Sequence, residues 1–220
     1  MQFRPRGFQM LPTVIKNLVI INGLVWLAQV TVGKEIPIED LFAMHYYQSE
    51  LFKPWQFITY MFLHDSHGPW HILFNMFALW MFGSVLENLW GMKRFLIFYL
   101  ACGIGAGIVQ MGALWFDIHQ VTTSDDYFRV MYSATLGASG AVMGIFAAFA
   151  YSFPSSELFI FPIPIPIKAK WAFAGYLAYD IISGLASPGS GVAHFAHVGG
   201  ALIGLLFMII WNKSNRRTFY

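Results

Sequence analysis

The chain of 220 residues has few charged side chains, because Asp, Glu, Lys and Arg together make up only 11% of it. Soluble globular domains carry about 25% charged residues, which keep their water-exposed surface soluble. Apolar residues account for 57% of the sequence and aromatic residues for 18%. The composition therefore argues against an ordinary soluble domain and favours a protein embedded in a lipid bilayer.

The single cysteine and the small net charge narrow the possible class of protein further. The single cysteine, Cys102, lies in an apolar run, so no disulfide within the chain is possible. The formal net charge is only +2 and no long basic run is present, which argues against nucleic acid as a partner. A cleaved secretion signal is not expected, because the first apolar run is long and lacks a clear small-residue cleavage site.

Six apolar runs approach the length of about 20 residues that a membrane-spanning helix needs. They cover roughly residues 14–32, 70–87, 94–115, 134–152, 170–187 and 194–211. The fourth is rich in small residues, so we expect it to lie deep in the bundle. The sequence predicts an all-α polytopic membrane protein with six transmembrane helices in a single domain, residues 1–220.

Basic residues separate to one side of these runs if the chain crosses six times. That side receives Arg4, Arg6, Lys16, Lys93, Arg94, Lys168, Lys170, Lys213, Arg216 and Arg217. The other side receives Lys34, Lys53 and Arg129 and most of the acidic residues. Because loops rich in Lys and Arg stay in the cytoplasm, both termini are expected there. The compact form, without recognisable sorting signals, favours a prokaryotic plasma (inner) membrane.

Polar residues occur near the outer ends of three spans that run in the same direction. His71 and Asn75 lie near the start of the second span, Ser139 near that of the fourth and His197 near that of the sixth. At 1.5 Å per residue, each lies roughly 2–8 Å below the end of its span. Polar groups are costly in a bilayer and mark functional sites, so the shared depth predicts one site.

These residue types suit hydrolysis by a serine nucleophile. A serine within reach of a histidine forms a nucleophile and its general base, since imidazole titrates near neutrality. Ser139 is the candidate nucleophile and His197 the candidate base. His71 and Asn75 are four residues apart and share a helix face. Their neutral side chains can donate hydrogen bonds to an oxyanion.

Each signal also has a structural interpretation. The glycines around Ser139 form a small-residue stripe, which in membrane helices typically indicates close packing. His71, Asn75 or His197 can serve only to bond one helix to another. Asp180 lies well inside the fifth span and nothing in the sequence places it beside His197, so we expect a structural hydrogen bond.

Metal binding is a competing chemistry. The candidate ligands of a metal or ion carrier are His64, His67, His71, His194 and His197. Gly68-Pro69 interrupts any helix that could carry the first three, and no HExxH motif is present. A metal site would also leave the glycine-rich setting of Ser139 unexplained.

In their order and spacing, the motifs resemble those of the rhomboid family of intramembrane serine proteases. They are His71-xxx-Asn75, Gly83-xxx-Glu87-xxx-Gly91, Gly137-Ala138-Ser139-Gly140 and Ala196-His197-xx-Gly200-xxx-Gly204. The resemblance covers nearly the whole chain and implies a six-helix rhomboid-like bundle. The chain departs from it at Trp55-Gln56, where many relatives have Trp-Arg.

The resemblance also implies an activity. Ser139 and His197 would form a dyad without an acid, and the Ser139 backbone N–H with the side chains of His71 and Asn75 would form the oxyanion hole. No metal or organic cofactor is implied. Substrates would be membrane proteins, often single-pass, cut near the outer end of a span, and residues 184–191 would form a lid. The alternative is a catalytically silent relative that binds or chaperones membrane clients, although inactive relatives tend to lose Ser139 or His197.

Overall fold

The computed structural model describes residues 7–159, 165–186 and 193–214. Within them the chain is mostly helical. The helices are α1 Thr13–Val32, α2 Ile38–Phe42, α3 Gln56–Thr59, the 3-10 helix η1 Tyr60–Phe62, α4 Trp70–Trp90, α5 Met92–Gln120, α6 Ser124–Met131, α7 Ser139–Ser152, α8 Ala169–Ala186 and α9 His194–Ser214. The strands β1 Glu157–Leu158 and β2 Ile167–Lys168 form an antiparallel pair.

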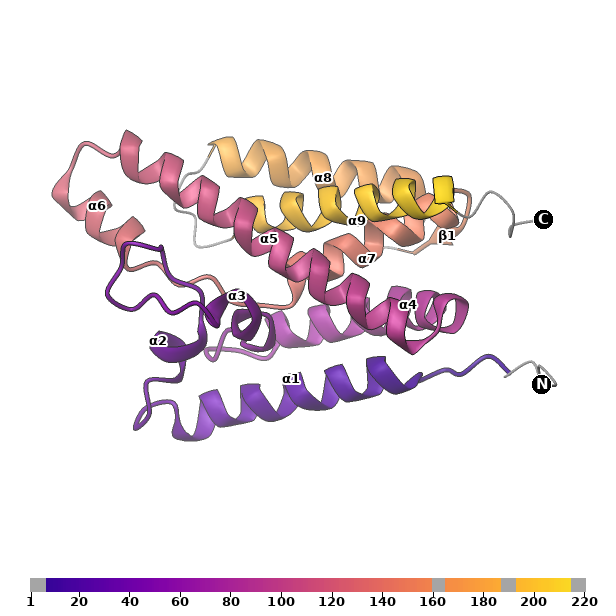
Figure 1. The fold of residues 1–220 in the computed structure, drawn as a ribbon, viewed down its shortest axis with the longest axis horizontal. Helices are drawn as coiled ribbons and strands as arrows, with labels where there is room; N and C mark the ends of the chain where they lie inside the picture. Colours follow the sequence, from indigo (N-terminus) through magenta and orange to yellow (C-terminus); the bar gives the residue numbers. More distant parts are fainter. Residues whose placement is uncertain (1–6, 160–164, 187–192, 215–220) are drawn as a thin grey trace.

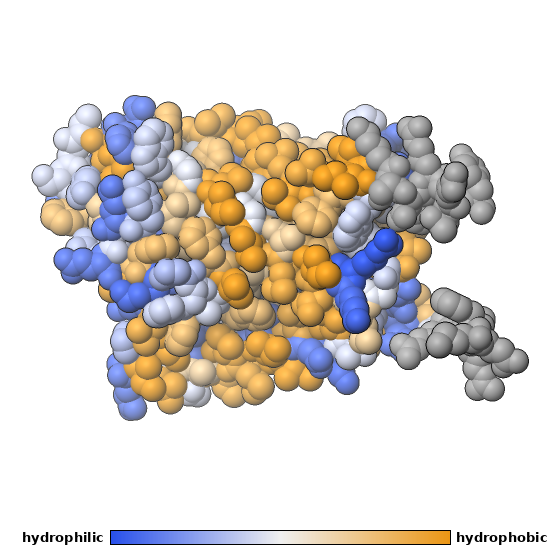
Figure 2. All heavy atoms as spheres, in the orientation of Figure 1, coloured by the Kyte–Doolittle hydropathy of each residue, from blue (hydrophilic) through white to orange (hydrophobic). Residues whose placement is uncertain are grey.

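Four helices in the described part of the chain are long and apolar enough to cross a membrane. They are α1, α4, α5 and α9. On the face drawn in Figure 2, apolar residues cover a broad middle region, and hydrophilic residues gather toward its two ends. With only 14 residues, α7 is about 21 Å long at 1.5 Å per residue. The 18-residue α8 includes Lys170 and Asp180 and is less apolar than the four. The count of six crossings remains a prediction.

Each of the six predicted segments contains a helix, but two differ in extent. The third continues beyond residue 115 to Gln120, and the fourth begins at Ser139 instead of residue 134. Before Ser139 the chain is extended: Thr135 and Met44 exchange two backbone hydrogen bonds of 2.9 Å. Gly137 then adopts a φ of 124°, which L side chains rarely adopt. The helix therefore starts only after this turn. Residues 187–191 of the predicted lid lie outside the described residues.

The fourth predicted span, α7, is buried along nearly its whole length, as its small residues predict. Every residue from Gly140 to Ala150 is buried. Within a bilayer, helices associate where small residues let their backbones approach. A Cβ atom added to Gly200 would overlap the carbonyl group of Gly140, and one added to Gly204 would crowd that of Gly144. The glycine stripe thus packs α7 against α9 and brings the starts of these helices together.

Glu87 on α4 binds the amino-terminal end of α1. Its two carboxylate oxygens accept the backbone N–H groups of Val14 and Ile15, both at 2.9 Å. The first N–H groups of a helix have no partner within it, and negative charge there is stabilising. One turn earlier, Gly83 leaves room for the Ile15 side chain. The second motif therefore joins α1 to α4.

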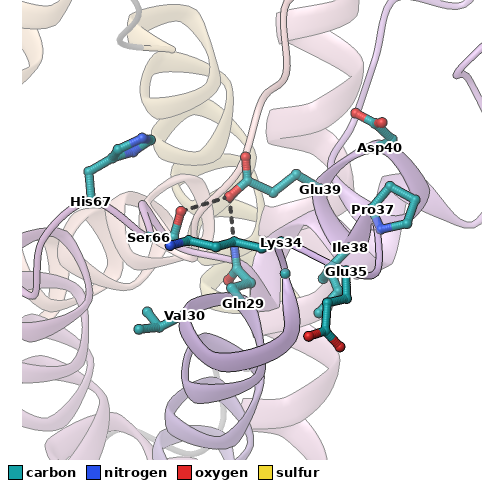
Figure 3. Close-up of a pocket in the computed structure, with 11 residues that line it drawn as sticks. Gln29, Val30, Lys34, Glu35, Pro37, Ile38, Glu39, Asp40, Ser66 and His67 are labelled. Carbon is teal, nitrogen blue, oxygen red and sulfur yellow. Dashed lines mark hydrogen bonds between the residues drawn. The ribbon is translucent and has the colours of Figure 1, made fainter.

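The long connection between α1 and α4 is packed against the bundle. Residues 43–46 are buried, and the backbone N–H of Gly137 donates to the Tyr60 carbonyl at 2.9 Å. At the start of the connection, the Gln29 amide donates to Glu39 at 3.1 Å (Figure 3). The same amide nitrogen donates to the His64 carbonyl at 2.9 Å. The connection therefore supports the turn that precedes Ser139.

Gln56 anchors this connection, at the position where the sequence departs from the resemblance. Its side chain is fully buried. The amide oxygen accepts the backbone N–H groups of His45 and Lys53, at 3.3 and 3.1 Å. The amide nitrogen donates to the carbonyls of Asp40 and Leu51, at 3.2 and 2.9 Å. A neutral side chain can thus satisfy four backbone groups without burying a charge.

Gln56→Leu is expected to lower the free energy of unfolding by about 1–3 kcal/mol, because it leaves buried backbone groups without partners. Denaturant or thermal unfolding of the purified protein in detergent measures this change. Gln48→Leu is the matched control, since the Gln48 amide bonds to the Tyr47 hydroxyl at the exposed surface. Equal stability of the two variants would contradict the anchoring role.

Candidate active site

Ser139 and His197 meet where α7 and α9 begin. The Ser139 Oγ atom lies 2.8 Å from the His197 Nε2 atom. Ser139 is the first residue of α7 and is partly exposed, whereas His197 is only 8% exposed. The structure therefore brings together the two residues that the sequence proposes as nucleophile and base, in hydrogen-bonding geometry.

A carboxylate from α8 completes this hydrogen-bonded chain. The Nδ1 atom of His197 lies 3.0 and 3.1 Å from the two carboxylate oxygens of Asp180. Asp180 is 1% exposed, and its Oδ1 atom also lies 2.8 Å from Nδ1 of His194. Sequence reasoning expected a structural hydrogen bond for Asp180 but did not place it beside His197. The available signal was that an acidic residue within an apolar helix needs a buried partner.

His71 approaches Ser139 through the space that Gly137 leaves open. A Cβ atom on Gly137 would lie 3.1 Å from Nε2 of His71 and 3.6 Å from Oγ of Ser139. The Nδ1 atom of His71 accepts the backbone N–H of Asp65 at 3.2 Å. In a neutral ring the proton is then on Nε2, so His71 presents an N–H donor beside Ser139.

Asn75 shares the face of α4 with His71 but bonds within its own helix. Its amide nitrogen donates to the His71 carbonyl at 2.9 Å, and its side chain is nearly buried. This contact lies within α4 and is not the bond to another helix that the structural interpretation predicted. The second N–H of the amide is still available to a ligand, because a primary amide carries two donors.

The side chain of His64 packs against His71 and is uncharged. The two rings pack edge to face with their centroids 5.1 Å apart. Burial, and to a smaller extent the neighbouring His71, lowers the pKa of His64 to about 3. Neither ring nitrogen has a hydrogen-bond partner among the described residues. His64 is therefore neutral at physiological pH and adds no positive charge to the site.

The five histidines considered as metal ligands do not form one cluster. His64 packs on His71, and the ring of His67 bonds to Asp65 at the exposed surface, 2.9 Å away. In the described part of the chain, the group close enough to hold a cation is Asp180, His194 and His197, with ligand atoms within 4.8 Å of one another. The hydrogen bonds to Asp180 account for this grouping, because each Nδ1–H has a carboxylate acceptor.

These features define the class: a helical, membrane-embedded protein with a serine and a histidine hydrogen-bonded in its interior. The family model of the Rhomboid domain matches residues 51–214. The chain is 31% identical over 208 residues to the rhomboid protease AarA of Providencia stuartii, which covers 89% of this chain and 71% of AarA. The chain belongs to the rhomboid family.

Two mitochondrial proteins are also similar. Rhomboid protein 1 of Saccharomyces cerevisiae is 31% identical over 139 residues, 63% of this chain and 37% of that protein. The human presenilin-associated rhomboid-like protein is 30% identical over 149 residues, 65% of this chain and 36% of that protein. The chain spans little more than a third of the length of these two relatives. Because relatives occur in a bacterium and in mitochondria, family membership alone does not indicate in which cellular membrane this protein resides.

Proposed function

We propose that the protein is an intramembrane serine endopeptidase that cuts membrane proteins, often single-pass, near the outer end of a transmembrane helix. The observation that carries the proposal is the contact of 2.8 Å between Ser139 Oγ and His197 Nε2. Two features support it: the glycine packing that brings α7 to α9, and the similarity to AarA, named a rhomboid protease. No metal or organic cofactor takes part.

Hydrolysis proceeds in two stages on these residues. Oγ of Ser139 attacks the carbonyl carbon of the peptide bond while its proton passes to Nε2 of His197. The tetrahedral intermediate collapses as the C–N bond breaks, and His197 returns the proton to the leaving amine. Water then attacks the ester on Ser139, with His197 again acting as base. The serine is regenerated when the C–O bond breaks.

The oxyanion of the intermediate is stabilised by hydrogen-bond donors at the start of α7. The backbone N–H of Ser139 lies in the first turn of that helix, where N–H groups have no helical partner and the dipole favours negative charge. The Nε2–H of His71 and the amide of Asn75 are the further donors. The position of Nε2 beside Gly137 supports the role of His71 more directly than the α4 contact supports that of Asn75.

His71→Ala is expected to lower kcat by about 10²–10³-fold, the cost of one oxyanion donor in a serine protease. KM changes little, because the donor acts on charge that develops only in the transition state. Steady-state cleavage of a single-span substrate in detergent measures both constants. His67→Ala is the matched control, since the His67 side chain is 92% exposed. A change confined to KM would contradict the assignment.

The proposed membrane orientation has six crossings and the basic end in the cytoplasm. Figure 1 shows the start of α1, the end of α9, the junction of α4 with α5, and β1 at one end of the molecule. The basic residues in elements at this end include Lys16, Lys93, Arg94 and Lys168. Both α7 and α9 run toward this end. Ser139, the first residue of α7, and His197, in the first turn of α9, would then lie nearer the outer side, in a prokaryotic plasma membrane.

The test is cleavage of a purified single-span substrate, with and without chelator, by the wild-type protein and by Ser139→Ala and His197→Ala. Chelator-insensitive cleavage that both substitutions abolish would establish the activity. Cleavage that survives Ser139→Ala would exclude the serine mechanism, and cleavage lost with chelator would favour a metal. A wild-type protein that is inert toward several substrates but retains them on affinity resin would be a client-binding relative.

A further inference from the structure

We propose that Asp180 is a positioning residue that fixes the tautomer of His197, so that this chain uses three aligned groups where the family resemblance implies two. The inference rests on the proposed function. Its geometric basis is a continuous line of hydrogen-bonding atoms from α8 through α9 to α7. The line runs from the Asp180 carboxylate through both ring nitrogens of His197 to Oγ of Ser139.

The carboxylate decides which nitrogen of His197 carries the proton. An ionised carboxylate can only accept hydrogen bonds, so Nδ1 of His197 must donate to Asp180 at 3.0 Å. The Nε2 atom of the neutral ring is then unprotonated and accepts the Ser139 hydroxyl proton at 2.8 Å. A ring held only by Ser139 could equally carry its proton on Nε2, and that tautomer cannot act as the base.

The carboxylate is itself held in place. His194 is the first residue of α9, one turn before His197, and its Nδ1–H donates to Oδ1 of Asp180 at 2.8 Å. Two residues of one helix turn therefore bond to one carboxylate of the neighbouring helix. The aromatic rings of Tyr176 and Tyr179 flank the pair, with centroids 6.3 Å from that of His197 and 5.9 Å from that of His194.

Burial makes this arrangement energetically effective. Asp180 is 1% exposed and the two histidines are 7% and 8% exposed, so little water screens the carboxylate from the imidazole. When His197 takes the proton of Ser139 it becomes an imidazolium, and the adjacent carboxylate stabilises this charge. If Asp180 only bonded α8 to α9 for packing, the other ring nitrogen of His197, Nε2, would not need to lie in line with Ser139.

Asp180→Asn is the variant that separates the two roles. The asparagine side chain keeps the size of Asp180, but its amide group can donate to Nδ1 and so favour the Nε2–H tautomer. We expect kcat to fall by about 10²–10⁴-fold, with KM nearly unchanged, as for the corresponding change in a serine protease triad. Labelling of Ser139 by a small fluorophosphonate should slow in parallel, because that reaction needs the base but no transmembrane substrate.

Asp125→Asn is the matched control, because Asp125 is exposed in the first turn of α6. Rates are expressed per folded molecule, determined from the unfolding transition of each preparation. If Asp180→Asn lowers only the folded fraction, with kcat and labelling per folded molecule equal to the wild-type values, Asp180 is structural and the inference is wrong. If the wild-type protein is inert toward substrates, or if Ser139→Ala still cleaves them, the proposed function itself is wrong. That result is distinct from a structural role of Asp180.

A measurement on the unsubstituted protein covers the case in which Asp180→Asn does not fold. Nitrogen-15 NMR of histidine-labelled protein distinguishes protonated from unprotonated ring nitrogens. The proposal requires neutral His197 to carry its proton on Nδ1, with Nε2 unprotonated, and His197→Gln identifies its resonances. A neutral His197 protonated on Nε2 would overturn the inference, whatever the variant shows.

Discussion

Ser139→Ala, His197→Ala and the double variant are expected to show nearly the same residual cleavage, each on the order of 10⁴–10⁶-fold below the wild-type rate. The two side chains act as one unit, because Nε2 of His197 takes the proton that Oγ of Ser139 loses over 2.8 Å. Once either is missing, the other has no partner in the reaction. The second substitution therefore removes nothing further.

The measurement is single-turnover cleavage with enzyme in excess, which detects slow residual rates without contributions from product release. Ser152→Ala provides the matched control, since Ser152 is the last residue of the same helix. It should cleave at the wild-type rate. If the losses in the two single variants multiply in the double variant, Ser139 and His197 act independently and the proposed mechanism does not hold.

Gly200→Ala is expected to abolish the folded bundle, with a loss of at least about 3 kcal/mol in the free energy of unfolding. Adding side-chain volume to a well-packed core typically costs 1–3 kcal/mol when side chains can adjust. Here the new Cβ atom would overlap the backbone carbonyl of Gly140, and a backbone group in the middle of the bundle cannot move aside. Separating α7 from α9 would also part Ser139 from His197.

Gly175→Ala is the matched control for this change. Gly175 lies in α8, and a Cβ atom there would meet nothing within 4 Å. Alanine should be tolerated at this position, and its higher helix propensity could raise stability slightly. Thermal unfolding and limited proteolysis of the three proteins in the same detergent compare them. A Gly200→Ala protein as stable as wild type would show that the two helices do not need this close approach.

The sequence indicated the pairing of Ser139 with His197 because apolar run length and charge segregation place both at similar depth. Depth alone does not give the rotation of one helix about its axis. Asp180 meets His197 because α8 turns that side chain toward α9, and no periodic pattern in the apolar α8 segment predicts this rotation. The contact of Asp180 with His197 was therefore missed because it depends on the rotation of α8 about its axis.

The segments that connect the spans were harder to predict from the sequence than the spans themselves. The anchoring by Gln56 depends on backbone groups up to 16 residues away, and the late start of α7 depends on the pairing of Thr135 with Met44. Neither contact leaves a periodic trace in the sequence. The amphipathic helix α6 was also not predicted, although Thr123 accepts the Asp126 N–H in the manner of an N-cap. The sequence pattern of a short capped helix is weaker than that of the apolar runs on either side, so such a helix is easily missed.

The shortness of α7 has a consequence for the supply of water. A helix of about 21 Å falls some 9 Å short of a hydrocarbon layer about 30 Å thick. If its last turn reaches the inner edge of that layer, its first residue, Ser139, is recessed below the outer edge. Hydrolysis would then require water to reach that depth, where Ser139 is partly exposed and His197 is buried. A scissile bond would need to leave the lipid only at that depth.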